Sequence, residues 1–267
     1  MSDVVGGPRT SSPATIDPRI RARRIAVQRD VGHRRLRRLL AALGGVVVLA
    51  AAWGLTRTPL LDVDRLEVRG ASNTGTEAVV AASTLHRGAA MVTAPLGRAA
   101  DRISVLPWVQ TVEVHRRWPG TVVIEVTERR PVAYVPAPDG VILLDAERRQ
   151  LAHVPSPPAG YVRLDVPAVR PKVGEPASAT IGPVLDIAAT IPKALVPRIV
   201  SLRPEGGGGV SGTVRLRDGT EAGVLLGGST QMGAKWLALA TILDEADPVG
   251  LAQIDVRVPG APALTRR

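Results

Sequence analysis

The chain has no cysteine, and this absence removes several kinds of chemistry at once. Without cysteine there is no disulfide, no thiolate ligand for zinc and no thiol nucleophile. Phenylalanine is also absent, and only 4 tryptophans and 2 tyrosines are present. Single-stranded nucleic acid binding uses aromatic side chains interleaved with basic ones, and the sequence has too few for this. The missing cysteine leaves the cellular compartment open, because a secreted bacterial protein can also lack disulfides.

Acidic residues are scarce near the N-terminus, which explains most of the net charge of +10. Residues 1–38 contain ten arginines and three aspartates, a net charge of +7, which leaves +3 for the other 229 residues. The basic character therefore belongs to a tail and not to a groove, and we expect no nucleic-acid partner. Proline, serine and glycine are frequent in residues 1–38, which predicts a disordered cytoplasmic tail.

A run without any charge follows the tail, from Leu39 to Thr56. Its length of 18 residues corresponds to about 27 Å of helix, close to the ~30 Å hydrocarbon core of a bilayer. Four arginines between Arg34 and Arg38 directly precede it. The sequence therefore predicts a transmembrane helix at 39–56, a cytoplasmic N-terminus and an extracytoplasmic chain after about residue 57. A cleaved signal peptide is the alternative, but the preceding region is too long for one.

Residues 60–128 have the pattern of a small β-α-α-β-β domain. Thr74 and Glu77 have the spacing of a capping box before a first short helix, and Pro107 ends a second one. Two alternating strands follow, at 108–117 and 121–129. A three-residue loop ending at Gly120 places one apolar face on the helices, and we expect a positive φ at Gly120.

Residues 129–261 are dominated by short strands separated by proline, aspartate and glycine, and a six-residue tail follows at 262–267. A helix is predicted after Ser229, in which Met232, Trp236, Leu239 and Leu243 form an apolar stripe that packs on the sheet. The predicted fold class is α+β. It combines one membrane span and a cytoplasmic tail with the β-α-α-β-β domain and a mostly antiparallel β domain with helices.

No group of residues has the spacing of an active site. The four histidines have no i,i+4 partner, and no metal site is expected. Gly207, Gly209 and Gly212 match G-x-G-x-x-G formally, but the strand-like "TVRLRD" follows where a dinucleotide site needs a helix. We therefore predict no catalytic residue, no cofactor and no small-molecule substrate.

The stretch "LPWVQTVEVHRRWPGTVVIEVTERRPVAYV" carries a more specific signal. It resembles the junction between the POTRA domain and the β domain of the bacterial cell-division family FtsQ, called DivIB in some bacteria. The resemblance extends over about residues 35–262, and its motif positions are Pro107, Trp108, Val109, Trp118, Pro119, Glu128, Arg129 and Pro131, with Lys235 in the late helix.

The resemblance implies a non-enzymatic scaffold of the divisome, in the plasma membrane at the septum. Its implied partners are FtsB and FtsL homologues and, through them, the septal peptidoglycan synthase complex. In the family a partner strand adds to a late edge strand, which maps onto Asp255, Val256, Arg257 and Val258. Pro259 and Pro262 cannot donate to a ladder, so this surface is either shortened or displaced.

Two other classes of function remain as alternatives. One is an anchored extracytoplasmic cell-wall enzyme or sensor that uses a POTRA domain for docking, but it needs a convergent polar cluster, and the sequence shows none. The other is an export factor of the outer-membrane type, which normally has repeated POTRA units and a β-barrel.

Overall fold

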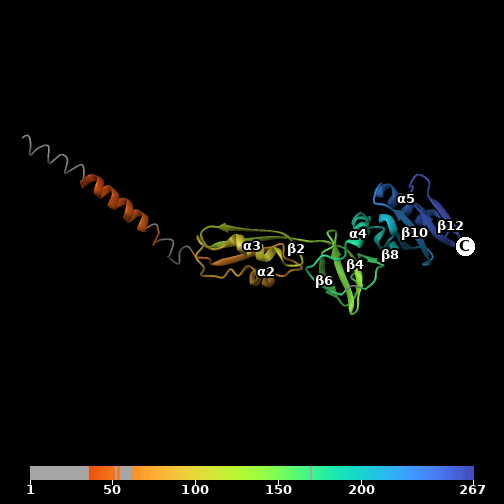
Figure 1. The fold of residues 1–267 in the computed structure, drawn as a ribbon, viewed down its shortest axis with the longest axis horizontal. Coiled ribbons are helices and arrows are strands. Elements are labelled where there is room, and N and C mark those ends of the chain that lie inside the picture. The colour runs from red at the N-terminus through yellow and green to blue at the C-terminus, as the bar shows by residue number, and fades with distance from the viewer. Residues whose placement is uncertain (1–35, 52, 55–61, 169) are drawn as a thin grey trace, which may run out of the picture. The chain divides into compact units, whose positions relative to one another are not determined.

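The computed structural model describes residues 36–51, 53–54, 62–168 and 170–267 (Figure 1). Contacts divide the chain at Asp62, where a compact unit, Asp62–Arg267, begins. Before it, residues 36–51 are helical and their leucine and valine side chains are exposed. Among the described residues, no helix is both long enough and apolar enough to cross a membrane. The predicted span also includes Ala52 and residues 55–56, which lie outside the described residues, as do residues 1–35 of the predicted tail.

A three-stranded sheet with two helices forms the first part of the unit (Figure 1). Its elements follow the predicted β-α-α-β-β order: β1 (Arg65–Arg69), α2 (Thr76–Ser83), α3 (Leu96–Ser104), β2 (Val109–Arg117) and β3 (Thr121–Glu128). β3 lies in the middle, parallel to β1 and antiparallel to β2. The core lies between this sheet and the helices and includes Val79, Ile103 and Ile124.

The β2–β3 hairpin has the register that the alternation predicts. Val112 lies opposite Val126, and Val114 lies opposite Ile124, so one apolar face is directed to the core. The expectation of a positive φ at Gly120 is wrong. Gly120 lies in a close approach instead, because a Cβ at this position would lie 2.2 Å from the Asp64 carboxylate and 3.1 Å from the Asp62 carbonyl oxygen.

A nine-stranded sheet forms the rest of the unit, in the order β12-β11-β10-β9-β8-β7-β4-β5-β6 (Figure 1). Five of its eight pairings are antiparallel, as expected, while β4–β7, β7–β8 and β10–β11 are parallel. Its strands are β4 (Pro131–Ala137), β5 (Gly140–Asp145), β6 (Gln150–Val154), β7 (Val162–Leu164), β8 (Ile199–Pro204), β9 (Val210–Arg215), β10 (Glu221–Gly227), β11 (Leu251–Asp255) and β12 (Ala263–Arg266).

Two α-helices contribute to the core of this larger sheet: α4 (Gly182–Ala188) and α5 (Met232–Glu245). The predicted stripe of Met232, Trp236, Leu239 and Leu243 is buried in that core. The glycine-rich segment that resembles a dinucleotide motif continues into β9, which contains Gly212, and no α-helix follows it before β10.

The end of the chain differs from the prediction. The strand expected to include Val256 and Val258 ends at Asp255, and β11 lies between β10 and β12. Asp255–Val258 is therefore not an edge strand. The two prolines at 259 and 262 break the ladder, so the chain turns there and returns as an additional strand, β12.

Candidate partner-binding site

Strand β12 is one edge of the nine-stranded sheet (Figure 1). Among the described strands it pairs only with β11, and all four of its residues are exposed. The Arg267 amide donates to the Gly250 carbonyl at 2.8 Å, so this amide is directed toward β11. Because amides alternate along a strand, those of Leu264 and Arg266 are directed outward. These outward groups can accept another strand.

The turn between β11 and β12 is fixed by Asp255 and Arg257. The Arg257 guanidinium donates to both carboxylate oxygens of Asp255, to Oδ1 at 3.0 Å and to Oδ2 at 2.6 Å. These hydrogen bonds hold the pKa of Asp255 below its ordinary value. Val256 is buried and donates its amide to Leu225 on β10 at 3.0 Å, whereas the Val258 side chain is exposed. Of the four residues predicted to bind a partner, Asp255 and Val256 therefore belong to the sheet and its core.

Lys235 lies behind this turn and is only 2% exposed. Its ammonium group donates to the carbonyls of Leu226 and Gly228, both at 2.7 Å. Burial lowers the pKa of Lys235. The two carbonyls flank Gly227, which has a φ of +65° and whose missing Cβ would lie 3.1 Å from the Arg257 side chain. Lys235 thus fixes the backbone at the end of β10. The aliphatic part of the Arg257 side chain packs against Gly227 in this segment.

An apolar hollow of about 430 Å³ lies beside α5, between its outer face and the turn. Leu237, Ile242, Pro259 and Pro262 are among its lining residues. On β12, Leu264 is opposite the buried Ile254 and so lies on the same face of the sheet. The edge strand is therefore bordered by apolar surface.

Glu128 and Arg129 lie where the chain passes from the small sheet to the larger one. Glu128 accepts hydrogen bonds from the backbone amides of Asn73 and Thr74, at 2.9 and 2.7 Å, and from both side chains, at 2.8 Å. Burial acts to raise the pKa of Glu128, but these hydrogen bonds outweigh it and the pKa lies below its ordinary value. The predicted capping box is therefore wrong: Gly75 is the N-cap of α2, and the Thr74 hydroxyl binds Glu128.

Arg129 connects the last strand of the small sheet with the larger one. It donates to the Val109 carbonyl at 3.0 Å and to the Asp145 carboxylate at 2.7 Å. The Asp145 side chain is 2% exposed, and its other oxygen accepts the Arg149 amide at 2.7 Å. This nearly buried ion pair therefore connects the three-stranded sheet, through Val109 on β2, to the nine-stranded sheet of the larger domain, through Asp145 on β5.

Other motif positions have structural surroundings of different kinds. Pro107 follows α3, Val109 begins β2 and is buried, and Trp108 and Pro131 line a hollow of about 460 Å³. Trp118 and Pro119 form the tip of the β2–β3 hairpin, and Trp118 is 54% exposed. The motif therefore combines two residues that join segments, Glu128 and Arg129, with one exposed aromatic side chain, Trp118.

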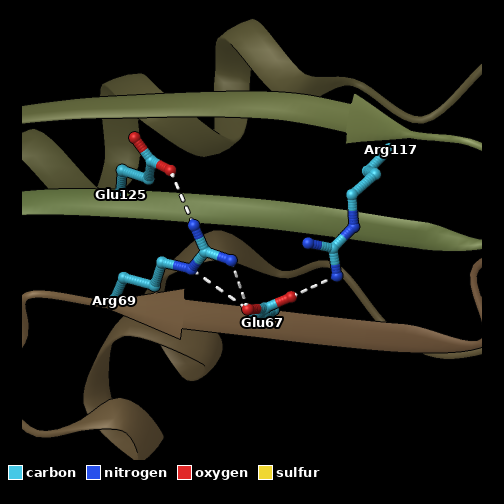
Figure 2. A network of polar contacts seen from close by, with 4 residues as sticks. All are labelled: Glu67, Arg69, Arg117 and Glu125. Carbon is cyan, nitrogen blue, oxygen red and sulfur yellow. Dashed lines mark hydrogen bonds and ion pairs between the residues drawn. The ribbon is translucent and has the colours of Figure 1, made fainter.

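The exposed face of the small sheet carries a network of ion pairs (Figure 2). Glu67 on β1 accepts hydrogen bonds from Arg69 at 2.7 Å and from Arg117 on β2 at 2.5 Å, and Arg69 also reaches Glu125 on β3. The hydrogen bonds from Arg69 lower the pKa of Glu67. This network ties the three strands together on the side away from the core.

No catalytic arrangement emerges from these contacts. In the part of the chain that the structure describes, no group of three or more histidine, cysteine or acidic side chains could hold a metal ion. The charged clusters at Glu67, Glu128, Asp145 and Asp255 are internally paired. These charged groups hold neighbouring segments of the chain together.

Comparisons with known proteins agree with this architecture. Residues 61–129 match the family model described as "POTRA domain, FtsQ-type". Three similar proteins are each named "Cell division protein FtsQ". The Corynebacterium glutamicum protein is 35% identical over 39% of this chain and 47% of its own length. The Mycolicibacterium smegmatis protein is 27% identical over 84% of this chain and 63% of its own length. The Streptomyces collinus protein is 29% identical over 87% of this chain and 89% of its own length.

The matches to the Corynebacterium and Mycolicibacterium proteins thus span about half to two thirds of those relatives. The similarity nevertheless extends well beyond the POTRA match into the nine-stranded sheet. Residues 61–129 are therefore a POTRA domain of the FtsQ type, and most of the chain is similar to proteins named "Cell division protein FtsQ".

Proposed function

We propose that the chain is a scaffold of the bacterial divisome, located at the septum, which acts by binding other proteins and not by catalysis. The names of its relatives support a role in cell division. The charged groups at Glu67, Glu128, Asp145 and Asp255 pair with neighbouring segments, which supports a structural role for them. The helix of exposed apolar residues at 36–51 supports the further proposal that 39–56 anchors the chain by a single span.

The single observation that carries the proposed mechanism is the edge strand β12. FtsB or FtsL homologues would bind by adding a strand to its outward amides and carbonyls, and through them the chain would help regulate septal peptidoglycan synthesis. The surface expected at Asp255–Val258 is displaced to Ala263–Arg266, because Asp255 already pairs with β12. The apolar hollow beside α5 lets side chains of the added segment pack next to the strand.

Co-purification of the full chain with FtsB and FtsL homologues tests this function, using two substitutions at one residue. Arg266→Pro removes an outward backbone donor, whereas Arg266→Ala removes only the side chain, with its contacts to the Val249 carbonyl and the Asp247 carboxylate. We expect Arg266→Ala to retain the partners and Arg266→Pro to lose them. Equal recovery with both variants would show that strand addition at β12 is wrong. Failure of the unmodified chain to recover either partner would contradict the proposed function itself.

A further inference from the structure

Three segments of the POTRA domain meet where the chain enters it. Asp62 forms an antiparallel bridge with Ala90, and the next amide, that of Val63, donates to Ala89 at 2.8 Å. The Gly120 carbonyl at the hairpin tip accepts the amide of Asp64 at 2.7 Å. The start of the domain, the loop at 86–94 and the tip at 117–120 therefore form one end of it, here called the entry face.

The entry face exposes large apolar side chains. The described residues of the POTRA domain have three exposed side chains of this kind, Val92, Val105 and Trp118. Two of them belong to the entry face: Val92 is 45% exposed and Trp118 is 54% exposed. Val105 lies after α3, and its carbonyl accepts a hydrogen bond from Arg149 in the larger domain.

Arg116 holds the loop in place. Its guanidinium donates to the Met91 carbonyl at 2.7 Å and to the Ala94 carbonyl at 2.8 Å. Arg117, next in sequence, is tied to Glu67, as Figure 2 shows. Val92 and Trp118 are therefore presented on loops that side-chain contacts fix to the sheet.

The chain length before Asp62 indicates what covers this face. The proposed membrane span ends at Thr56, six residues earlier. A fully extended chain spans about 3.5 Å per residue, so this connection reaches at most about 21 Å. Asp62 then lies within about 21 Å of the bilayer interface, and the entry face is the part of the domain next to Asp62.

The composition of the entry face suits that interface. Tryptophan is the side chain most typical of the membrane–water boundary, and arginine extends its charge toward lipid headgroups. Arg65, Arg87 and Arg117 are exposed on the same segments, and Asp62 and Asp64, together with the Glu67 that pairs with Arg117, limit the net charge. Attraction to anionic lipid is therefore weak, and insertion of apolar side chains supplies the contact.

We propose that the entry face of the POTRA domain, through Val92 and Trp118, contacts the lipid headgroup layer. This inference rests on the proposed membrane anchor. The contact would restrain the POTRA domain against the membrane.

The absence of cysteine permits a direct test. Full-length Val92→Cys and Trp118→Cys variants each carry one thiol, which is labelled with an environment-sensitive fluorophore after reconstitution into phosphatidylcholine–phosphatidylglycerol vesicles. Val173→Cys is the matched control, because Val173 has the same 45% exposure as Val92 but lies in the larger domain. The Val92→Cys variant keeps Trp118, so it still tests the contact if the Trp118→Cys variant does not fold.

We expect headgroup-level nitroxide lipids to quench the labels at 92 and 118 and to leave the label at 173 unquenched. Equal quenching at all three positions, or none at 92 and 118, would overturn the inference. Extraction of the chain from the vesicles by alkaline carbonate separates the two proposals. A chain that resists extraction but shows no quenching refutes only the lipid contact, whereas a chain that is extracted refutes the anchor and the contact together.

Discussion

Replacement of Glu128 by glutamine removes a carboxylate on which the start of α2 depends. Four donors from Asn73 and Thr74 converge on its two oxygens. Glutamine keeps one acceptor oxygen but turns an NH2 group toward donors, so about two of these bonds are lost. Hydrogen bonds to charged groups contribute about 1.5–3 kcal/mol each and do not add fully. Because the carboxylate is only partly buried, we expect a loss of about 2 kcal/mol.

Amide hydrogen exchange measures this loss as the free energy of local opening. A loss of about 2 kcal/mol accelerates exchange about thirty-fold in peptides that cover Asn73–Glu77 and β3. Glu113→Gln is the matched control, since Glu113 is an exposed carboxylate of the same sheet, and we expect it to change stability by less than about 0.5 kcal/mol. Equal exchange rates in the two variants would show that Glu128 does not hold the segment at Asn73 and Thr74 against β3.

The effect of Glu128→Gln also depends on pH. The pKa of Glu128 is lower in the folded chain, so its stabilisation is complete above the unfolded-state pKa of about 4.3. As the pH falls through the folded-state pKa, the carboxylate is protonated and the stabilisation disappears. The difference in thermal midpoint between the wild type and the variant should therefore be constant at neutral pH and shrink in acid. A difference that grows in acid would contradict this assignment.

Three further substitutions test other contacts. Arg129→Ala leaves Asp145 charged and nearly buried without its partner, which should lower the free energy of unfolding in urea by about 3 kcal/mol. A double variant, Arg129→Ala with Asp145→Asn, that is no more stable than Arg129→Ala alone would contradict this. Lys235→Met leaves two carbonyls without a donor and should lower stability by about 1–3 kcal/mol, and an unchanged thermal midpoint would show that the ammonium is dispensable. Gly120→Ala places a Cβ 2.2 Å from the Asp64 carboxylate and should speed exchange of the β1 amides; unchanged exchange would show that the loop adapts.

Alternation and spacing predicted the parts of the fold that depend on local patterns. The register of β2 and β3 follows from one apolar face, because a shift by one residue would turn Ile124 away from the core. The buried stripe of α5 follows from its helical spacing. The same spacing also places Lys235 on the buried face, three residues after Met232 and four before Leu239, which is a signal that the sequence analysis did not use.

Contacts between distant segments were not predictable from these patterns. The local sequence presents Thr74 as a helix cap, but a carboxylate 54 residues away competes successfully for its hydroxyl. β12 has only four residues and no apolar alternation, so it has no strand signal of its own. Its strand conformation depends on pairing with β11 after the turn, which also explains why the edge was expected at Asp255–Val258.

The most direct test of strand addition at β12 is residue-resolved amide exchange of the full chain, with and without the extracytoplasmic domains of FtsB and FtsL homologues. We predict that the partner protects the outward amides of Leu264 and Arg266, while the Thr265 amide, which is directed toward β11, changes little. Protection confined to the POTRA domain, with Leu264 and Arg266 still exchanging freely, would contradict the account.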